Sequence, residues 1–330
     1  TGVGIRVAMS GSGKRVVVGS TAHGHSGIQS GAAWVFTNPG TPTQAEAELI
    51  PAGAFFDMRF ASSLAINAAG DVVVVGAPGW ASGSWSPRVY VFRFNGTSWV
   101  EEWYGTGWNS DRLGTSVATN AAGDVVAAGA PLRSPGIHLN VGAVEVYRHQ
   151  ATGWAHEATL LPNDVTDSDG VGGVIAMSDD GTLIAATSRG GPNPPLSGAV
   201  YLFQRSSGVW AQIAKLQEPV AYALGGFGMS MAFDATPQTL AISNSLDNRQ
   251  AAGGGVVNVF SRGRFGWAYE TALLQTFPAS GNGLGRSIAI NATGQRIIAG
   301  ANAYMNPSGI RHGAVLEYQR GNGLGRSIAI

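Results

Sequence analysis

Residues 59–78, RFASSLAINAAGDVVVVGAP, carry the pattern that decides the fold. A short strand of small residues enters a tight polar turn, and an apolar strand then runs into Gly-Ala. The same phrase returns from Gly4, Arg112, Val171, Phe227 and Leu284. Its turn residues lie 53–58 residues apart, at Gly13, Gly70, Gly123, Gly181, Pro237 and Gly294. A period this long, filled only with strands, predicts a radial or stacked repeat architecture.

Two further strands complete each repeat. The third opens on Gly or Pro and closes on an aromatic residue, at Phe36, Phe92, Tyr147, Phe203, Phe260 and Tyr318. A Trp soon afterwards opens a fourth strand, at Trp99, Trp154, Trp210 and Trp267. The periodicity of these Trp residues marks them as packing residues. Each unit is therefore predicted to be four short antiparallel strands.

Apolar runs such as residues 72–75, VVVV, are continuous rather than alternating, which predicts burial on both faces of the sheet. Blades of a propeller meet that condition and leave only short, protected edges. A linear solenoid is the alternative, but it would need polar capping units, and no atypical repeat is found. We predict an all-β fold, a β-propeller of four-stranded antiparallel blades with six recognisable repeats, and seven blades remain open. The near-even repeats favour a single domain over residues 1–330.

The composition excludes several classes of protein. Charged residues make up 12% of the chain, and 20 basic side chains balance 20 acidic ones, so a basic nucleic-acid surface is not expected. With no cysteine, the chain has no disulfide or thiolate site. No apolar run reaches membrane-spanning length and no signal peptide opens the chain, so no membrane insertion is expected. The glycosylation sequons at Asn95 and Asn291 favour a secreted, extracellular or surface location.

Four of the repeated phrases, at residues 59–78, 112–131, 226–243 and 283–301, resemble FG-GAP repeats, the blades of integrin-α-type propellers. Gly-Ala-Pro at 76–78 and 129–131 follows Phe-Gly or Leu-Gly in register, and the resemblance covers nearly the whole chain. It implies the propeller fold. It leaves the function open, because such propellers serve adhesion, lectin and assembly roles alike.

Integrin-like blades often carry a DxDxDG calcium loop between their first two strands. The equivalent turns here begin at Ser10, Asn67, Asn120, Ser178, Asp234 and Asn291, and none has enough carboxylates. They are predicted to be plain hairpin turns, capped by the polar residue, with no metal. Three carboxylates crowd another loop, at Asp164, Asp167 and Asp169, where a solvated acidic turn is favoured over a metal site. Asp57 and Asp111 are expected to cap turns.

Catalytic motifs are absent. There is no HExxH, since His156-Glu157 lacks a second His at helical spacing, and no catalytic residue or cofactor is predicted. The loops hold aromatic and His residues that could form a binding face, although packing over the blade ends is an equal alternative. On loops between second and third strands these are His23, His25, Trp80, Trp85, His138, Tyr304 and His312. On loops between blades they are Phe55, Phe56, Trp108 and Tyr222.

These loops differ greatly from unit to unit, which favours one composite surface over several equivalent sugar sites. The sequence thus predicts a non-enzymatic extracellular module that presents loops to a protein partner or to neighbouring copies. A lectin that binds glycans is the alternative, and a hydrolase with a site on the loop face comes third.

Residues 321–330, GNGLGRSIAI, repeat residues 281–290 identically. They stand where a Trp-led fourth strand of the sixth unit is expected. The segment either supplies that missing strand, begins a seventh unit, or is an artefact of a duplicated or wrongly recorded stretch.

Overall fold

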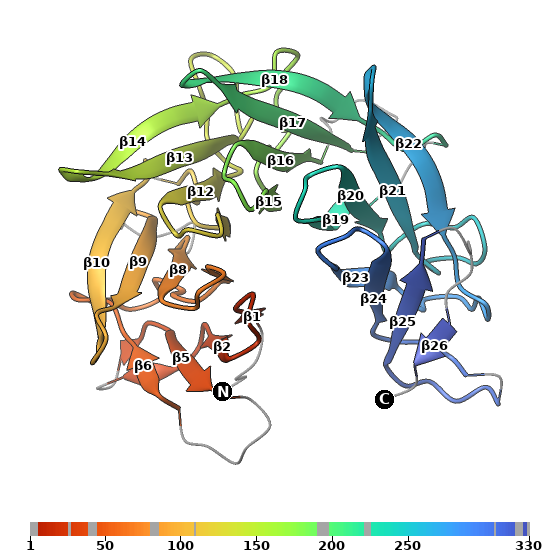
Figure 1. The fold of residues 1–330 in the computed structure, drawn as a ribbon, viewed down its shortest axis with the longest axis horizontal. Coiled ribbons are helices and arrows are strands. Elements are labelled where there is room, and N and C mark those ends of the chain that lie inside the picture. The colour runs from red at the N-terminus through yellow and green to blue at the C-terminus, as the bar shows by residue number, and fades with distance from the viewer. Residues whose placement is uncertain are drawn as a thin grey trace. The chain divides into compact units, whose positions relative to one another are not determined.

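The computed structural model describes residues 6–25, 28–38, 45–79, 86–108, 110–189, 198–220, 226–306, 308–320 and 326–328. Within these ranges the regular elements are strands, which pair into six four-stranded antiparallel sheets. Figure 1 labels most of these strands in chain order. The sheets are the blades of a β-propeller and are numbered here in chain order. The predicted fold class is confirmed. None of the described segments forms a helix long and apolar enough to cross a membrane.

The chain divides into two compact units. The first, Thr1–Ile175 with Asp179–Gly181, holds blades 1 to 3. Blade 1 consists of β1 (Arg6–Met9), β2 (Arg15–Ser20), β5 (Ala32–Thr37) and β6 (Ala47–Leu49), and a short ribbon joins β3 (Gly24–His25) to β4 (Ile28–Gln29). Blade 2 consists of β7 (Ser63–Ile66), β8 (Val72–Ala77), β9 (Arg88–Phe94) and β10 (Trp99–Thr106). Blade 3 consists of β11 (Ser116–Thr119), β12 (Val125–Ala130), β13 (Ala143–Gln150) and β14 (Gly153–Leu160).

The second unit, Ala176–Ser178 with Thr182–Ile330, holds blades 4 to 6 apart from the first residue of β15. Blade 4 consists of β15 (Ile175–Met177), β16 (Leu183–Ser188), β17 (Ala199–Ser206) and β18 (Val209–Leu216). Blade 5 consists of β19 (Phe227–Phe233), β20 (Thr239–Asn244), β21 (Val256–Gly263) and β22 (Gly266–Leu273). Blade 6 consists of β23 (Leu284–Ile290), β24 (Arg296–Ala301), β25 (Ala314–Gln319) and β26 (Arg326–Ile328). The prediction of a single domain stays a prediction.

The second strands of blades 2 to 5 are buried on both faces, as the continuous apolar runs predict, whereas β2 and β24 keep alternate residues partly or fully exposed. In β8, Val73 and Val75 join a core that includes blade 1, whereas Val72 and Val74 join a core that includes blade 3. Because side chains alternate along a strand, one run of four valines fills two inter-blade layers. All six residues of β8 are buried.

The repeated glycines allow neighbouring blades to touch through their backbones. A Cβ on Gly76, the glycine of the first Gly-Ala-Pro, would lie 2.0 Å from the carbonyl oxygen of Gly114. Gly129, one repeat later, would meet the carbonyl oxygen of Gly172 at 1.9 Å. The hydroxyl of Ser63 donates to that same Gly114 oxygen at 2.8 Å. The end of the repeated phrase in one blade therefore contacts the start of the phrase in the next blade.

The predicted hairpin turns are confirmed. In the turn before β8, the buried side-chain oxygen of Asn67 accepts hydrogen bonds from the backbone N–H groups of Gly70, Asp71 and Val72, each at 3.0 Å. Gly70 has a φ of 82°, a left-handed value that costs glycine little. Asp234 fills the same role in blade 5, where it accepts from the N–H of Thr239 at 3.0 Å.

The Trp residues of the fourth strands pack between blades, as predicted. The indole N–H of Trp99 donates to Glu46 in the preceding blade at 3.3 Å, and that of Trp154 donates to Glu102 at 3.1 Å. In blade 5 the buried indole N–H of Trp267 has no partner. Strand pairing places Ile213 of blade 4 where Glu102 stands in blade 2, which accounts for the missing acceptor.

The duplicated terminal segment contributes a strand to blade 6. Arg326–Ile328 form β26 and pair antiparallel with β25, opposite Val315, Leu316 and Glu317. This agrees with the first of the three alternatives that the sequence leaves open.

Candidate functional site

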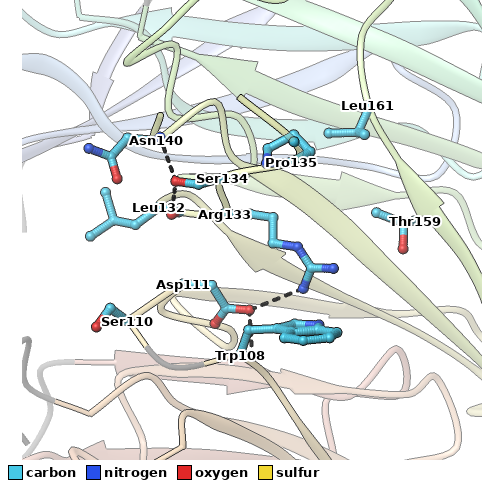
Figure 2. A pocket seen from close by; sticks show the side chains of 11 residues that line it. Trp108, Ser110, Asp111, Leu132, Arg133, Ser134, Pro135, Asn140, Thr159 and Leu161 are labelled. Carbon is cyan, nitrogen blue, oxygen red and sulfur yellow. Dashed lines mark hydrogen bonds and ion pairs between the residues drawn. The ribbon is translucent and has the colours of Figure 1, made fainter. Parts of the chain in front are cut away.

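A cleft in the first unit lies beside β10 and β14, and it is lined also by the segment after β10 and the loop after β12. It consists of two adjoining cavities of about 510 and 540 Å³. Trp108, Arg133 and Thr159 line both of them. Figure 2 shows the first cavity, with the Arg133 guanidinium directed at Asp111 beside the Trp108 ring.

Arg133 lies between two buried carboxylates. Its Nη1 atom is 3.5 Å from Oδ2 of Asp111 and 3.6 Å from Oε1 of Glu145. Asp111 also accepts hydrogen bonds from the backbone N–H groups of Trp108, at 2.8 Å, and Leu113, at 2.9 Å. Those bonds confirm its predicted role as a turn cap. Burial raises the pKa of the Asp111 carboxyl above its ordinary value, although the two backbone donors and Arg133 oppose that rise.

Glu145 joins the guanidinium to an imidazole. Its Oε2 atom is 2.7 Å from Nε2 of His156, and it accepts the hydroxyl hydrogen of Thr159 at 2.7 Å. Its Oε1 atom is buried and accepts no hydrogen bond, and its ion-pair partner is the Arg133 guanidinium at 3.6 Å. The His156 ring is half exposed, so the carboxylate–imidazole pair is accessible from the cleft.

Aromatic side chains form the walls. Trp103 and Trp154 stack with their ring centres 5.6 Å apart and their planes 26° apart. Tyr147 packs against Trp103 at 4.8 Å and meets the His156 ring edge-on at 5.4 Å. Burial and the neighbouring Glu145 carboxylate raise the pKa of the Tyr147 hydroxyl, which therefore stays protonated at neutral pH. Trp108 is 70% exposed, and the Arg133 guanidinium lies 5.0 Å from the centre of its ring.

A glycine replaces a leucine at the end of β10. Strand pairing aligns Gly105 with Leu160, Leu216 and Leu273 in the following blades. A Cβ on Gly105 would lie 2.6 Å from the Trp103 ring and 3.1 Å from the Tyr147 ring. Gly107 is equally confined, since its Cβ would lie 2.6 Å from the Asp111 carboxylate. Glycine at both places lets Trp103 and Asp111 occupy the space.

Glu145 has no acidic counterpart in the aligned strands. The equivalent positions of blades 2, 4 and 5 hold Tyr90, Tyr201 and Asn258. A comparison of the repeats position by position would thus have singled out this residue. Sequence motifs alone could not do so, because Glu145 and His156 are brought together by the pairing of β13 with β14.

The predicted loop residues are scattered, and Trp108 alone of those described lines the cleft. Phe56 is 66% exposed, whereas Phe55 packs against the core of blades 1 and 2. The imidazole of His23 lies 3.3 Å from Glu48 and contacts Trp34. His25 is described only as part of the backbone of β3. Trp80, Trp85 and Tyr222 lie outside the described residues.

In the second unit, Tyr304 is 4% exposed and packs near His312, whose Nδ1 lies 2.9 Å from the carbonyl oxygen of Gly313. Neither residue belongs to the cleft. Both candidate glycosylation sites, Asn95 and Asn291, are exposed in hairpin turns, where their side chains accept backbone hydrogen bonds. Whether these predicted residues bind anything is untested.

The acidic loop between blades 3 and 4 uses its carboxylates internally. Asp169 is buried and accepts from the N–H of Thr166 at 2.6 Å, and exposed Asp167 lies 3.1 Å from Nδ1 of His138. Asp164 is exposed. Among the residues that the structure describes, no group of three His, Asp or Glu side chains is arranged to hold a metal ion.

Comparison with protein families gives one match, to the FG-GAP repeat, over residues 154–203. This segment runs from β14 to β17, and its pattern is the one that all six blades share. The chain is an FG-GAP-type β-propeller. The resemblance seen in the sequence is thereby confirmed. A search of curated proteins gives no match to this FG-GAP propeller.

Solved structures share the fold. The FG-GAP propeller is similar to Sqt1 from Chaetomium thermophilum, with a TM-score of 0.60 and 15% identity over 98% of this chain and 71% of that one. It is also similar to the periplasmic gluconolactonase PpgL from Pseudomonas aeruginosa, with a TM-score of 0.62 and 14% identity over 98% of this chain and 84% of that one. At these identities the likeness shows the fold.

These structures correct the functional prediction. One propeller of this fold is an enzyme, so the step from the fold to a non-enzymatic adhesion or assembly module was wrong. The prediction that the chain is not an enzyme fails for the same reason. Nothing in the comparisons points to adhesion, and the cleft holds the kind of polar groups that catalysis uses.

Proposed function

We propose that this FG-GAP propeller is a hydrolase that opens a sugar-derived lactone in the cleft beside β10 and β14. The observation that carries the proposal is the buried Glu145 carboxylate, in contact with the accessible imidazole of His156 and with Arg133 close by. The fold of a gluconolactonase supports the choice of reaction. The aromatic walls support a sugar-type substrate, because flat rings pack against the apolar faces of sugars.

Binding falls to the aromatic and polar side chains. The exposed ring of Trp108 offers a stacking surface at the mouth of both cavities. The larger cavity, with Glu145 and His156, receives the reacting ring. The other, which Ser110, Ser134 and Asn140 help to line, offers hydroxyl and amide groups for further substrate hydroxyls. Each volume lies within the range of about 300–1,000 Å³ that is usual for small-ligand pockets, so a lactone bearing a second sugar unit fits as well.

His156 acts as the general base. Glu145 lies at Nε2 of the imidazole and holds the tautomer in which Nε2 carries the proton. Nδ1 is then free to take a proton from water, and the carboxylate stabilises the imidazolium that results. Thr159 donates to the same carboxylate oxygen and fixes its position.

Arg133 stabilises the charge that develops on the substrate. As the water oxygen bonds to the lactone carbonyl carbon, the carbonyl oxygen becomes an oxyanion, which the guanidinium can bind. The tetrahedral intermediate collapses with cleavage of the ring C–O bond. The proton held by His156 passes to the departing ring oxygen, and the product is an open-chain hydroxy acid. The carboxylate of this product and the carboxylate of Asp111 then both lie at the Arg133 guanidinium.

We also propose that the protein is exported, to the extracellular space or the cell surface, and that its ligand is a sugar derivative. The periplasmic gluconolactonase with the same fold supports export. The exposed sequon residues Asn95 and Asn291 are compatible with it, since a glycan on either would extend into solvent.

Hydrolysis of glucono-δ-lactone and of the lactone of a disaccharide acid tests the proposal, with acid release followed by a pH indicator and corrected for the spontaneous reaction. Glu145→Gln and His156→Gln should each lower kcat/KM by about 10²–10⁴, the usual contribution of general acid–base catalysis. Glu157→Gln, on the same strand but paired with Arg148 at 3.1 Å and absent from the cleft lining, is the matched control and should change little. No enzymatic hydrolysis of either lactone, or equal losses in all three variants, would overturn the proposal.

A further inference from the structure

A separate cavity of about 180 Å³ lies between blades 5 and 6 in the second unit. Its apolar walls include Val259, Leu273 and Ile297, one from each of three strands. At its polar side Glu270 of β22 forms an ion pair with Arg320, whose Nη1 also donates to Thr239 at 2.9 Å. The proposed reaction does not use this cavity.

Tyr318 lines this cavity and has an unsatisfied hydroxyl. The residue is 1% exposed, and its buried oxygen has no hydrogen-bond partner. Burial raises the pKa of the phenol, which keeps it a neutral donor and acceptor. A buried polar atom without a partner is rare enough in native proteins to need an explanation, and a bound ligand supplies one.

The repeats show what normally fills this position. A Trp lies seven residues after the aromatic residue that closes the third strand, as Trp99 follows Phe92 and Trp154 follows Tyr147. Its ring packs between blades, and its indole N–H donates to a glutamate of the preceding blade. Blade 5 presents the equivalent glutamate, Glu270, toward blade 6. Residues 319–330, however, contain no Trp.

A second ring is also missing. Strand pairing aligns Thr271 with Trp103, which stacks on Trp154 between blades 2 and 3. Between blades 5 and 6 the glutamate and the apolar walls are retained, while Thr271 stands where blade 2 has the Trp103 ring. Thr271 lines the cavity.

We infer that this cavity is a binding socket for an indole-type ring that carries an N–H donor. A cavity of about 150 Å³ lined by apolar side chains binds benzene, so one of this size accepts a somewhat larger ring. The Tyr318 hydroxyl can accept the ring N–H, and Val259, Leu273 and Ile297 contact its faces. The ring comes either from a free small molecule or from a Trp side chain of a protein partner.

Titration with indole and with N-acetyl-tryptophanamide, observed by ligand NMR and calorimetry, tests the inference. Both probes should saturate one site. Tighter binding of indole would identify a free small molecule as the ligand, and tighter binding of N-acetyl-tryptophanamide would identify a Trp side chain of a protein partner. Thr271→Trp, which restores the ring found in blade 2, should fill the socket and abolish binding. Val209→Trp, on the exposed start of β18, adds an indole elsewhere and should leave binding unchanged.

Tyr318→Phe keeps the ring and removes the hydroxyl, so it should weaken indole binding at least fivefold while leaving the binding of toluene unchanged. This variant decides the matter should Thr271→Trp fail to fold. Absence of saturable binding by either probe, binding that survives in folded Thr271→Trp, or undiminished indole binding in Tyr318→Phe would each overturn the inference. None of these measurements depends on lactone hydrolysis.

Discussion

Replacing Trp154 and, separately, Trp267 by Phe isolates what one indole N–H contributes to stability. Both residues open the fourth strand of their blade, and both are partly buried. The N–H of Trp154 donates to Glu102 at 3.1 Å, whereas the buried N–H of Trp267 has no acceptor. The two substitutions remove the same ring volume, although only Trp154 also stacks on a second indole, that of Trp103, which adds to the cost of Trp154→Phe.

The expected difference follows from these contacts. A hydrogen bond to a charged group contributes about 1.5–3 kcal/mol, and solvent screening of the partly exposed Glu102 reduces it to about 1 kcal/mol. Removing the unsatisfied N–H of Trp267 recovers a desolvation cost of about 1–3 kcal/mol. Trp154→Phe should therefore be more destabilising than Trp267→Phe by about 2–4 kcal/mol. For a unit of this size that corresponds to a difference in Tm of roughly 4–16 °C.

Urea denaturation followed by far-UV circular dichroism measures both variants against the unaltered chain. Glu102→Gln in the Trp154→Phe background should add less than it does alone, because the two residues share one interaction. Equal destabilisation by the two Trp substitutions, or a larger effect at Trp267, would refute the assignment of the hydrogen bond as the source of the difference.

Three further predictions concern single residues. Burial raises the pKa of the Asp111 carboxyl above its ordinary value of 3.8, so ionisation of this group opposes folding. The free energy of unfolding of the unaltered chain, relative to that of Asp111→Asn, should therefore fall as pH rises through the raised pKa. Unfolding measured over a series of acid pH values checks this. Gly105→Leu should cost about 1–3 kcal/mol in thermal unfolding, since the new side chain displaces the Trp103 ring. Asn67→Ala removes the side-chain acceptor of the N–H groups of Asp71 and Val72, whereas the N–H of Gly70 keeps its bond to the backbone carbonyl of Asn67. It should lower Tm more than Asn291→Ala, whose exposed turn can be solvated, and equal losses would contradict this difference between buried and exposed turns.

The fold was predictable because its signal is local and is repeated six times. Each copy places small residues, a polar turn and an apolar run in the same order, so neighbouring copies support one another's interpretation. The hairpin caps at Asn67 and Asp234 followed from the same phrase. The interlocking of Gly76 with Gly114 was not visible in advance, because it depends on which backbones meet between blades.

The candidate site was predicted only at Trp108, which projects from a loop as binding residues commonly do. Glu145 and His156 lie within strands that the periodic pattern assigns to packing. The sequence search tested His156 against a helical zinc motif, whereas its partner lies across an antiparallel pair, a relation that no fixed spacing encodes. The role of Arg133 is visible only in the folded structure, where its guanidinium lies between the carboxylates of Asp111 and Glu145.

The identity of residues 281–290 and 321–330 has a consequence for how blade 6 assembles. To an unfolded chain the two segments are chemically the same, and both can approach β24. Residues 291–295 join the first copy to that strand, while residues 302–320 separate the second from it. Loop-closure entropy favours the short connection by only about 1.2 kcal/mol, or roughly sevenfold. The folding of blade 6 therefore partitions between two competing pairings with β24, and a chain that forms the wrong pairing first must release it.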